Sequence, residues 1–149
     1  MTQTPFHPLN DRISVAPQIL IEDVARAKDE GFTLIVNNRP DGEEPDAPQG
    51  PQIEAAAKAA GLSYIAIPVT HAGFSAPQID ALKKAMADLG EDGRVLAYCR
   101  SGTRSTLLWA LTSASAGVNP ATIAEAASAQ GYDISPVRLA VDSLAAQAR

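Results

Sequence analysis

The sequence predicts an α/β fold in which a mostly parallel central sheet of roughly four to five strands carries helices on both faces. Three observations support this fold class. Short apolar and β-branched runs alternate with segments that have apolar residues at helical spacing. The apolar runs stop near residue 100. Only helical patterns follow them, which predicts an all-helical C-terminal part.

The expected elements follow one another with short connections, and glycines mark the ends of several helices. An extended, proline-containing lead-in is expected over residues 1–12. Strands are expected over 13–16, 32–36, 63–67 and 95–97. Helices are expected over 21–30, 52–60, 77–89, about 105–117, 122–130 and 137–147. Without a repeat or a change in composition, the pattern predicts a single domain over 1–149.

Composition and charge narrow the classes of function. The hydrophobic fraction of 46% and charged fraction of 19% are typical of a soluble globular protein. A net charge of −5 argues against nucleic acid or an anionic membrane as a general partner. Cys99 is the only cysteine, which excludes an internal disulfide and suits a reducing compartment. No leader pattern or membrane-length apolar run is apparent, so a cytoplasmic location is expected.

The stretch 94–105 concentrates the residues that can do chemistry. A buried strand runs into Cys99, and a polar loop then leads into a helix. A thiol is nucleophilic as its thiolate, and the positive end of a helix favours an anion in the first turn. Arg100 and Arg104 add fixed positive charge, and Gly102 lets successive N–H groups turn inward as an anion nest. Taken singly, Cys99 suits a core position and the arginines suit solvent, but their combination favours a catalytic anion site.

Two loops at other strand ends are candidates for the same site. In an open parallel sheet, the loops that follow the carboxyl ends of the strands line the ligand crevice. Arg39 follows the strand 32–36, and His71 lies in the loop after the strand 63–67. The default interpretation of each is a solvated loop residue, because a lone loop arginine or histidine is usually just exposed. We therefore expect Arg39 and His71 to border the site only if the loops meet there.

The spacing of the loop bears on the reaction. Four residues separate Cys99 from Arg104. The cysteine-dependent phosphatases carry a loop one residue longer, which wraps a tetrahedral phosphate. The string Tyr98-Cys-Arg-Ser-Gly-Thr-Arg-Ser105 resembles instead the active loop of single-domain rhodaneses, sulfurtransferases whose short loop wraps a persulfide sulfur. However, a rhodanese domain usually places another strand after this loop, whereas a helical ending resembles that of the dual-specificity phosphatases.

One family combines both features. Over nearly its whole length, the chain resembles the bacterial phosphatase-like domain that occurs alone or beside metallo-β-lactamase-type sulfur dioxygenases in beta-lactamase-hydrolase-like proteins. The stretches that carry the resemblance are Val15-Ala-Pro-Gln-Ile19, Asn37-Asn-Arg-Pro-Asp-Gly-Glu43, Tyr64-Ile-Ala-Ile-Pro-Val69 and Leu96-Ala-Tyr-Cys-Arg-Ser-Gly-Thr-Arg-Ser105. The resemblance implies a bacterial source and a phosphatase-like cysteine-loop architecture. It also implies a sulfurtransferase or, in some descriptions, a non-classical phosphatase.

Sulfur transfer is the first functional expectation. A Cys99 thiolate would take the outer sulfur of a thiosulfate- or persulfide-type donor and pass it to a thiol acceptor, glutathione being one candidate. This assigns catalysis to Cys99 and Arg104, without a metal or organic cofactor. Substrate binding is expected from Arg100, Ser101, Gly102, Thr103, Ser105, Arg39 and His71. The resemblance adds a sulfur dioxygenase as a functional partner.

Two alternatives stay open. A cysteine-dependent phosphatase would need a general acid for its leaving group. The loop 69–75 contains no carboxylate, Asp80 falls within the next expected helix, and Asp41 and His71 are the remaining candidates. The second alternative is a non-catalytic module that binds an anion or a persulfide for a partner enzyme, although an intact Cys99 argues against it.

Overall fold

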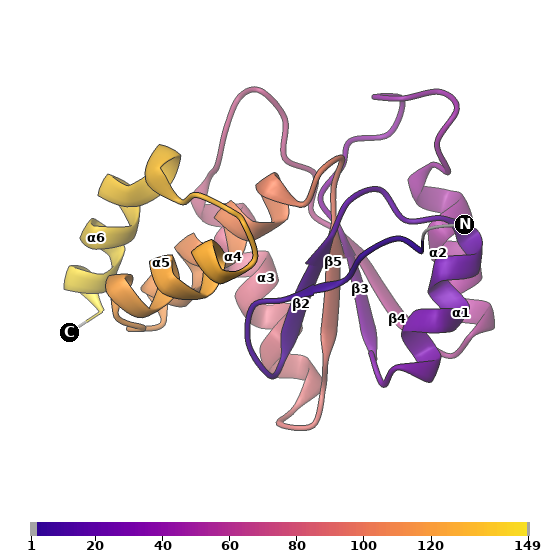
Figure 1. Cartoon of the computed structure of the whole chain (residues 1–149), viewed down its shortest axis with the longest axis horizontal. Coiled ribbons are helices and arrows are strands. Elements are labelled where there is room, and N and C mark those ends of the chain that lie inside the picture. Colours follow the sequence, from indigo (N-terminus) through magenta and orange to yellow (C-terminus); the bar gives the residue numbers. More distant parts are fainter. Residues whose placement is uncertain (1–2, 149) are drawn as a thin grey trace.

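The computed structural model describes residues 3–148 and contains one five-stranded sheet (Figure 1). The strand order is β1-β2-β5-β3-β4. β2, β5, β3 and β4 are parallel, and the two-residue β1 pairs antiparallel with β2. The strands are β1 (His7–Pro8), β2 (Ile13–Ala16), β3 (Leu34–Asn37), β4 (Ser63–Ala66) and β5 (Val95–Tyr98). The mostly parallel sheet is thus confirmed. β1 was expected only as part of an extended lead-in, because a proline-containing edge strand of two residues has no recognisable pattern.

Helices cover both faces of the sheet, as the sequence predicts (Figure 1). α1 (Ile21–Asp29) and α2 (Gly50–Ala59) pack on one face. On the other side lie α3 (Ala76–Leu89), α4 (Thr103–Ser115), α5 (Pro120–Ala129) and α6 (Arg138–Gln147), with the 3-10 turn Ser135–Val137 before α6. The expected helical ending is confirmed, since residues 99–148 contain no strand. None of the helices described over 3–148 is long and apolar enough to cross a membrane.

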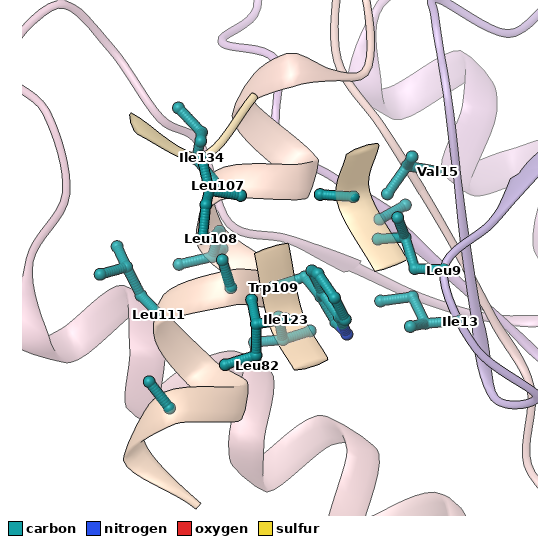
Figure 2. Packing of buried hydrophobic residues seen from close by; sticks show 14 of the residues in the cluster. Leu9, Ile13, Val15, Leu82, Leu107, Leu108, Trp109, Leu111, Ile123 and Ile134 are labelled. Atoms are coloured by element: carbon teal, nitrogen blue, oxygen red, sulfur yellow. The ribbon is translucent and has the colours of Figure 1, made fainter. Parts of the chain in front are cut away.

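Two hydrophobic clusters hold these layers together, one on each face of the sheet. The larger cluster joins the sheet to α3, α4, α5 and α6. Trp109 of α4 points toward Leu9 and Ile13 beside the sheet, while Leu108 and Leu111 face the outer helices (Figure 2). α4 therefore lies between the sheet and the outer helices, and it is buried on almost every side.

The sheet brings the starting points of three loops together at one edge. β5 lies between β2 and β3, and the last residues of these strands pair in register, Ala16 with Tyr98 and Asn37 with Tyr98. The segments that leave β2, β3 and β5 therefore start side by side at the carboxyl edge of the sheet. The loop of Cys99 leaves the central strand of the three, so its neighbours on both sides are fixed by strand pairing.

Candidate active site

Cys99 follows directly after β5 and has no exposed surface. The loop folds back over the sulfur, because the N–H of Gly102 donates a hydrogen bond to Cys99 Sγ at 3.1 Å. This turn needs Gly102, whose φ of +93° lies in the left-handed region. Gly102 is also the N-cap of α4, so the thiol lies against the first turn of a long buried helix. The site therefore holds the sulfur atom of a cysteine, which is nucleophilic as a thiolate, at the positive end of a helix.

The backbone of the loop offers an anion cradle. Within residues 3–148, no protein acceptor pairs with the N–H groups of Arg100, Ser101, Arg104 or Ser105. The N–H of Thr103 is used locally, since it donates to Ser101 Oγ at 3.3 Å. Unpaired N–H groups in one tight loop form a nest that binds an anion. The sequence prediction of an anion-binding loop thus has a geometric basis in these four donors.

The guanidinium of Arg104 is held from outside the loop. Its Nη1 donates to Glu43 Oε2 at 2.8 Å and to the carbonyl of Val69 at 2.9 Å, and its Nη2 donates to Glu43 Oε1 at 2.7 Å. These contacts use three of the five N–H donors of an arginine. The N–H of Nε and the second N–H of Nη2 remain, and together they form one edge of the guanidinium. Such an edge binds an oxyanion in a bidentate manner.

Arg104 interacts electrostatically with Cys99 as well as with Glu43. The pKa of Arg104 is raised, first by its hydrogen bond to Glu43 and further by the charge of a Cys99 thiolate and a hydrogen bond to it. Conversely, the hydrogen bond from Arg104 lowers the pKa of Glu43 from 4.5 to about 2, with a further contribution from Arg39. Glu43 is therefore a carboxylate at neutral pH, and it cannot serve there as a proton donor.

Gln18 and Glu43 are site residues that the sequence analysis did not identify. Arg39 donates from Nε to Glu43 Oε1 at 2.8 Å and from Nη1 to Gln18 Oε1 at 2.9 Å. The backbone N–H of Gln18 donates to the carbonyl of Arg100 at 3.2 Å. Both lie in stretches that carried the family resemblance, Gln18 in 15–19 and Glu43 in 37–43. That signal could have pointed to them.

The hydroxyl groups of the loop have local partners. Ser105 is buried, and its Oγ donates to Asn38 Oδ1 at 2.8 Å, so its backbone N–H is the group that it offers to a ligand. Ser101 Oγ donates to Thr103 Oγ1 at 2.9 Å. Tyr132, from the segment before α6, donates from its hydroxyl to the carbonyl of Ser101 at 3.0 Å. Asn38 and Tyr132 thus hold the loop from outside, and the contact between Ser101 and Thr103 holds it from within.

The remaining candidates lie further out. The loop after β4 does reach the site, but through the carbonyl of Val69, while His71 is exposed at its tip. Arg39 contacts Glu43 and Gln18 and is thus one residue removed from Arg104. Asp41 accepts the N–H of Gly50 at 2.8 Å, at the start of α2. Asp80 lies within α3, as expected.

Within residues 3–148, no three His, Cys, Asp or Glu side chains are grouped to hold a metal ion.

The fold and this site together define a domain of the cysteine-loop phosphatase architecture. The model of the family "Beta-lactamase hydrolase-like protein, phosphatase-like domain" matches residues 5–116. The chain belongs to this family, which confirms the resemblance seen in the sequence. A beta-lactamase hydrolase-like protein of Agrobacterium fabrum is 36% identical over 127 residues, 85% of this chain and 29% of that protein. One from Xylella fastidiosa is 36% identical over 104 residues, 70% of this chain and 24% of that protein.

Solved structures of phosphatases share the architecture. A protein of Neisseria meningitidis, named as a candidate phosphatase, superposes with a TM-score of 0.77 at 30% identity and covers 92% of this chain and 96% of its own. Kinase-associated phosphatase, with its catalytic-site cysteine replaced by serine, has a TM-score of 0.75 and covers 97% and 98% of the two chains. Its identity is 14%, so this likeness concerns the fold alone.

These comparisons bear on the two reactions unequally. The family match and a phosphatase-like neighbour at 30% identity favour the cysteine-dependent phosphatase, the alternative expected from the sequence, over sulfur transfer. Sulfur transfer, the first expectation, is not shown by any of them. The chain also spans less than a third of the curated relatives it matches, so activities of the longer proteins do not pass to it directly.

Proposed function

We propose that the chain is a cysteine-dependent phosphatase in which Cys99 is the nucleophile and Arg104 binds the phosphoryl group. One observation carries the proposal: Glu43 and Val69 leave a single two-donor edge of Arg104 free, in the same loop as the buried sulfur of Cys99. A phosphoryl group carries several oxygen atoms that need hydrogen-bond donors. The two-donor edge of Arg104 and the unpaired N–H groups of the loop together supply these donors.

The reaction follows in two displacements. The Cys99 thiolate attacks phosphorus, the S–P bond forms, and the bond from phosphorus to the leaving oxygen breaks. Water then attacks the phosphorus of the cysteinyl phosphate. The S–P bond breaks, inorganic phosphate leaves, and the Cys99 thiolate is regenerated. Arg104 and the four loop N–H groups stabilise the charge on the equatorial oxygens in both steps.

The site favours a particular class of substrate. Among residues 3–148, no carboxylic acid is seen to face the leaving oxygen, because Glu43 is ionised and Asp41 contacts the N–H of Gly50 at the start of α2. Alkoxides are poor leaving groups without a proton, whereas phenolates are much less basic. We therefore infer that aryl phosphomonoesters are the better substrates.

Sulfur transfer is the second candidate, and the same missing acid favours it. A Cys99 thiolate that attacks the outer sulfur of thiosulfate forms a persulfide, while sulfite leaves with the electron pair of the broken S–S bond. A thiolate acceptor then takes the outer sulfur and frees Cys99. Neither step needs a carboxylic acid. The four-residue spacing between Cys99 and Arg104 also suits a single bound sulfur atom.

One experiment separates the candidates. The protein and its Cys99→Ser variant are incubated with an aryl phosphate and, separately, with thiosulfate or glutathione persulfide. We expect phosphate release from the aryl phosphate, absent in the variant. A mass gain of ~32 Da with the sulfur donors, removed by thiols and absent in the variant, would replace the phosphatase proposal with sulfur transfer. If neither phosphate release nor a sulfur adduct is observed, the non-catalytic binding module replaces both enzyme proposals.

A further inference from the structure

Hydrogen bonds connect the two ends of the cysteine loop through residues outside it. At the first end, the carbonyl of Arg100 accepts the N–H of Gln18. At the second end, both terminal nitrogens of Arg104 donate to Glu43. Arg39 joins these two anchors, because its guanidinium contacts Gln18 and Glu43 at once. The contacts close a ring that starts and finishes in the loop.

We propose that Gln18, Arg39 and Glu43 form a brace that positions the Arg104 guanidinium and holds the loop in its anion-binding shape. The proposal assigns positioning roles, since none of the three is placed to act on the reacting atoms. It deepens the proposed function, on which its kinetic test rests. It also limits how Arg104 can bind: only the edge formed by Nε and Nη2 can meet the substrate, so the group recognised is a bidentate oxyanion.

The physical gain lies in preorganisation. A free arginine side chain loses rotamer entropy when it is fixed. The brace fixes Arg104 before substrate arrives, and charge-assisted hydrogen bonds are the stronger kind. The side chains of Arg39, Arg104 and Glu43 are 10%, 23% and 30% exposed, so the two arginines are partly buried while Glu43 keeps contact with water. Two guanidiniums and one carboxylate leave one positive charge, so the cradle still attracts an anion.

Glu43 and Arg39 thus have different parts in the brace. Glu43 contacts Arg104 directly through both carboxylate oxygens. Arg39 holds Glu43 Oε1, the oxygen that also accepts from Arg104 Nη2. Removing Glu43 should leave Arg104 held only by the carbonyl of Val69, whereas removing Arg39 should loosen Glu43 and so affect Arg104 less.

The kinetic test uses a double-mutant cycle. Glu43→Gln is made in the native protein and in an Arg104→Ala background, with Glu44→Gln as the matched control in the same loop. We expect Glu43→Gln to lower kcat/KM for an aryl phosphate by about 10- to 100-fold, since misplacement of about 1 Å can cost that much. Glu44→Gln should leave it unchanged. In the Arg104→Ala background, Glu43→Gln should have less than a ~2-fold further effect. An equal effect in both backgrounds would overturn the proposal, because Glu43 would then act without Arg104.

A second measurement does not depend on the natural reaction. Cys99 is alkylated with iodoacetate and with iodoacetamide, and the ratio of the two rates reports how well the site favours an anion. We expect Glu43→Gln to lower this ratio and Arg39→Met to lower it less, with both effects lost in the Arg104→Ala background. Because the loss of the Glu43 charge alone would raise the ratio, an unchanged or higher ratio in Glu43→Gln would sink the brace. If the native protein hydrolyses no phosphate but the ratio behaves as expected, the phosphatase proposal fails and the brace stands. Should Glu43→Gln not fold, Gln18→Ala and Arg39→Met carry the same test.

Discussion

Glu43 holds the Arg104 guanidinium with both carboxylate oxygens, at 2.7 and 2.8 Å, although the two residues are 61 positions apart. The pairing of β3 with β5 explains the contact, because it starts the Glu43 loop and the Cys99 loop side by side. A residue that no local motif marks thus becomes the main contact of the arginine on which anion binding depends.

The first prediction concerns the pH dependence of stability. The folded-state pKa of Glu43 is about 2, below its ordinary 4.5. A lowered carboxyl pKa stabilises the folded state above pH 4.5, and this contribution is lost as the pH falls toward 2. We expect Glu43→Gln to cost about 1 kcal/mol at pH 7, a value reduced for solvent screening. Urea unfolding at a series of pH values should show this cost shrinking below pH 4.5. A cost that grows on acidification would contradict the assignment.

The second prediction concerns the shape of the Arg104 donor group. Lysine keeps the charge but lacks the planar fork that contacts Glu43 and the substrate together. We expect Arg104→Lys to lose at least ~100-fold in Cys99-dependent turnover, close to the loss in Arg104→Ala, because a missing oxyanion donor costs about that much. Arg138, which pairs with Asp142 on exposed α6, offers the matched control Arg138→Lys. Near-native turnover in Arg104→Lys would show that charge alone suffices.

The third prediction separates backbone strain from side-chain clash. Gly102 and Gly42 both have positive φ, +93° and +82°. A Cβ on Gly102 would clash with the Tyr132 hydroxyl oxygen, whereas one on Gly42 would meet nothing within 4 Å. Gly42→Ala should therefore cost only the left-handed strain, about 1–2 kcal/mol. Gly102→Ala should cost more in chemical denaturation and should also abolish turnover, because the turn that brings its N–H to Cys99 is displaced. If the two substitutions lower the free energy of unfolding equally, then the Tyr132 side chain moves aside without a measurable cost.

The predictable part of the fold follows from local patterns. Two kinds of local signal place the elements to within a few residues. They are apolar strand runs such as Val95-Leu-Ala-Tyr98 and glycines at helix ends such as Gly31 and Gly61. α2 begins at Gly50 rather than at residue 52, because Pro51 is accepted in a first helical turn. The antiparallel β1 escaped prediction, since its pairing partner β2, not its own two residues, makes it a strand.

The site was predictable only in its local part. Cys99, Gly102 and Arg104 are contiguous in the chain, so their chemistry can be read from one stretch. Glu43 and Gln18 reach the loop through strand order, which the sequence pattern does not specify. Glu43 also looks like an ordinary turn residue, and only its contacts with two arginines distinguish it.

The fourth prediction tests the residue that precedes the nucleophile. Tyr98 is 1% exposed, and its hydroxyl has no hydrogen-bond partner within residues 3–148. Burial raises its pKa, so the phenol stays neutral. An unpaired buried hydroxyl costs about 1–3 kcal/mol, so Tyr98→Phe should stabilise the protein or leave it unchanged.

Tyr64 is the matched control for this change. It is a half-buried tyrosine whose hydroxyl accepts a hydrogen bond from Asn37 Nδ2 at 3.0 Å. Tyr64→Phe should lower the free energy of unfolding by about 1 kcal/mol, because the amide loses its acceptor. If Tyr98→Phe is instead the more destabilising of the two in urea, then the Tyr98 hydroxyl binds a partner such as an internal water. The polar pocket that Tyr98 shares with Gln18 and Arg39, with room of about 10 Å³, would be where that water lies.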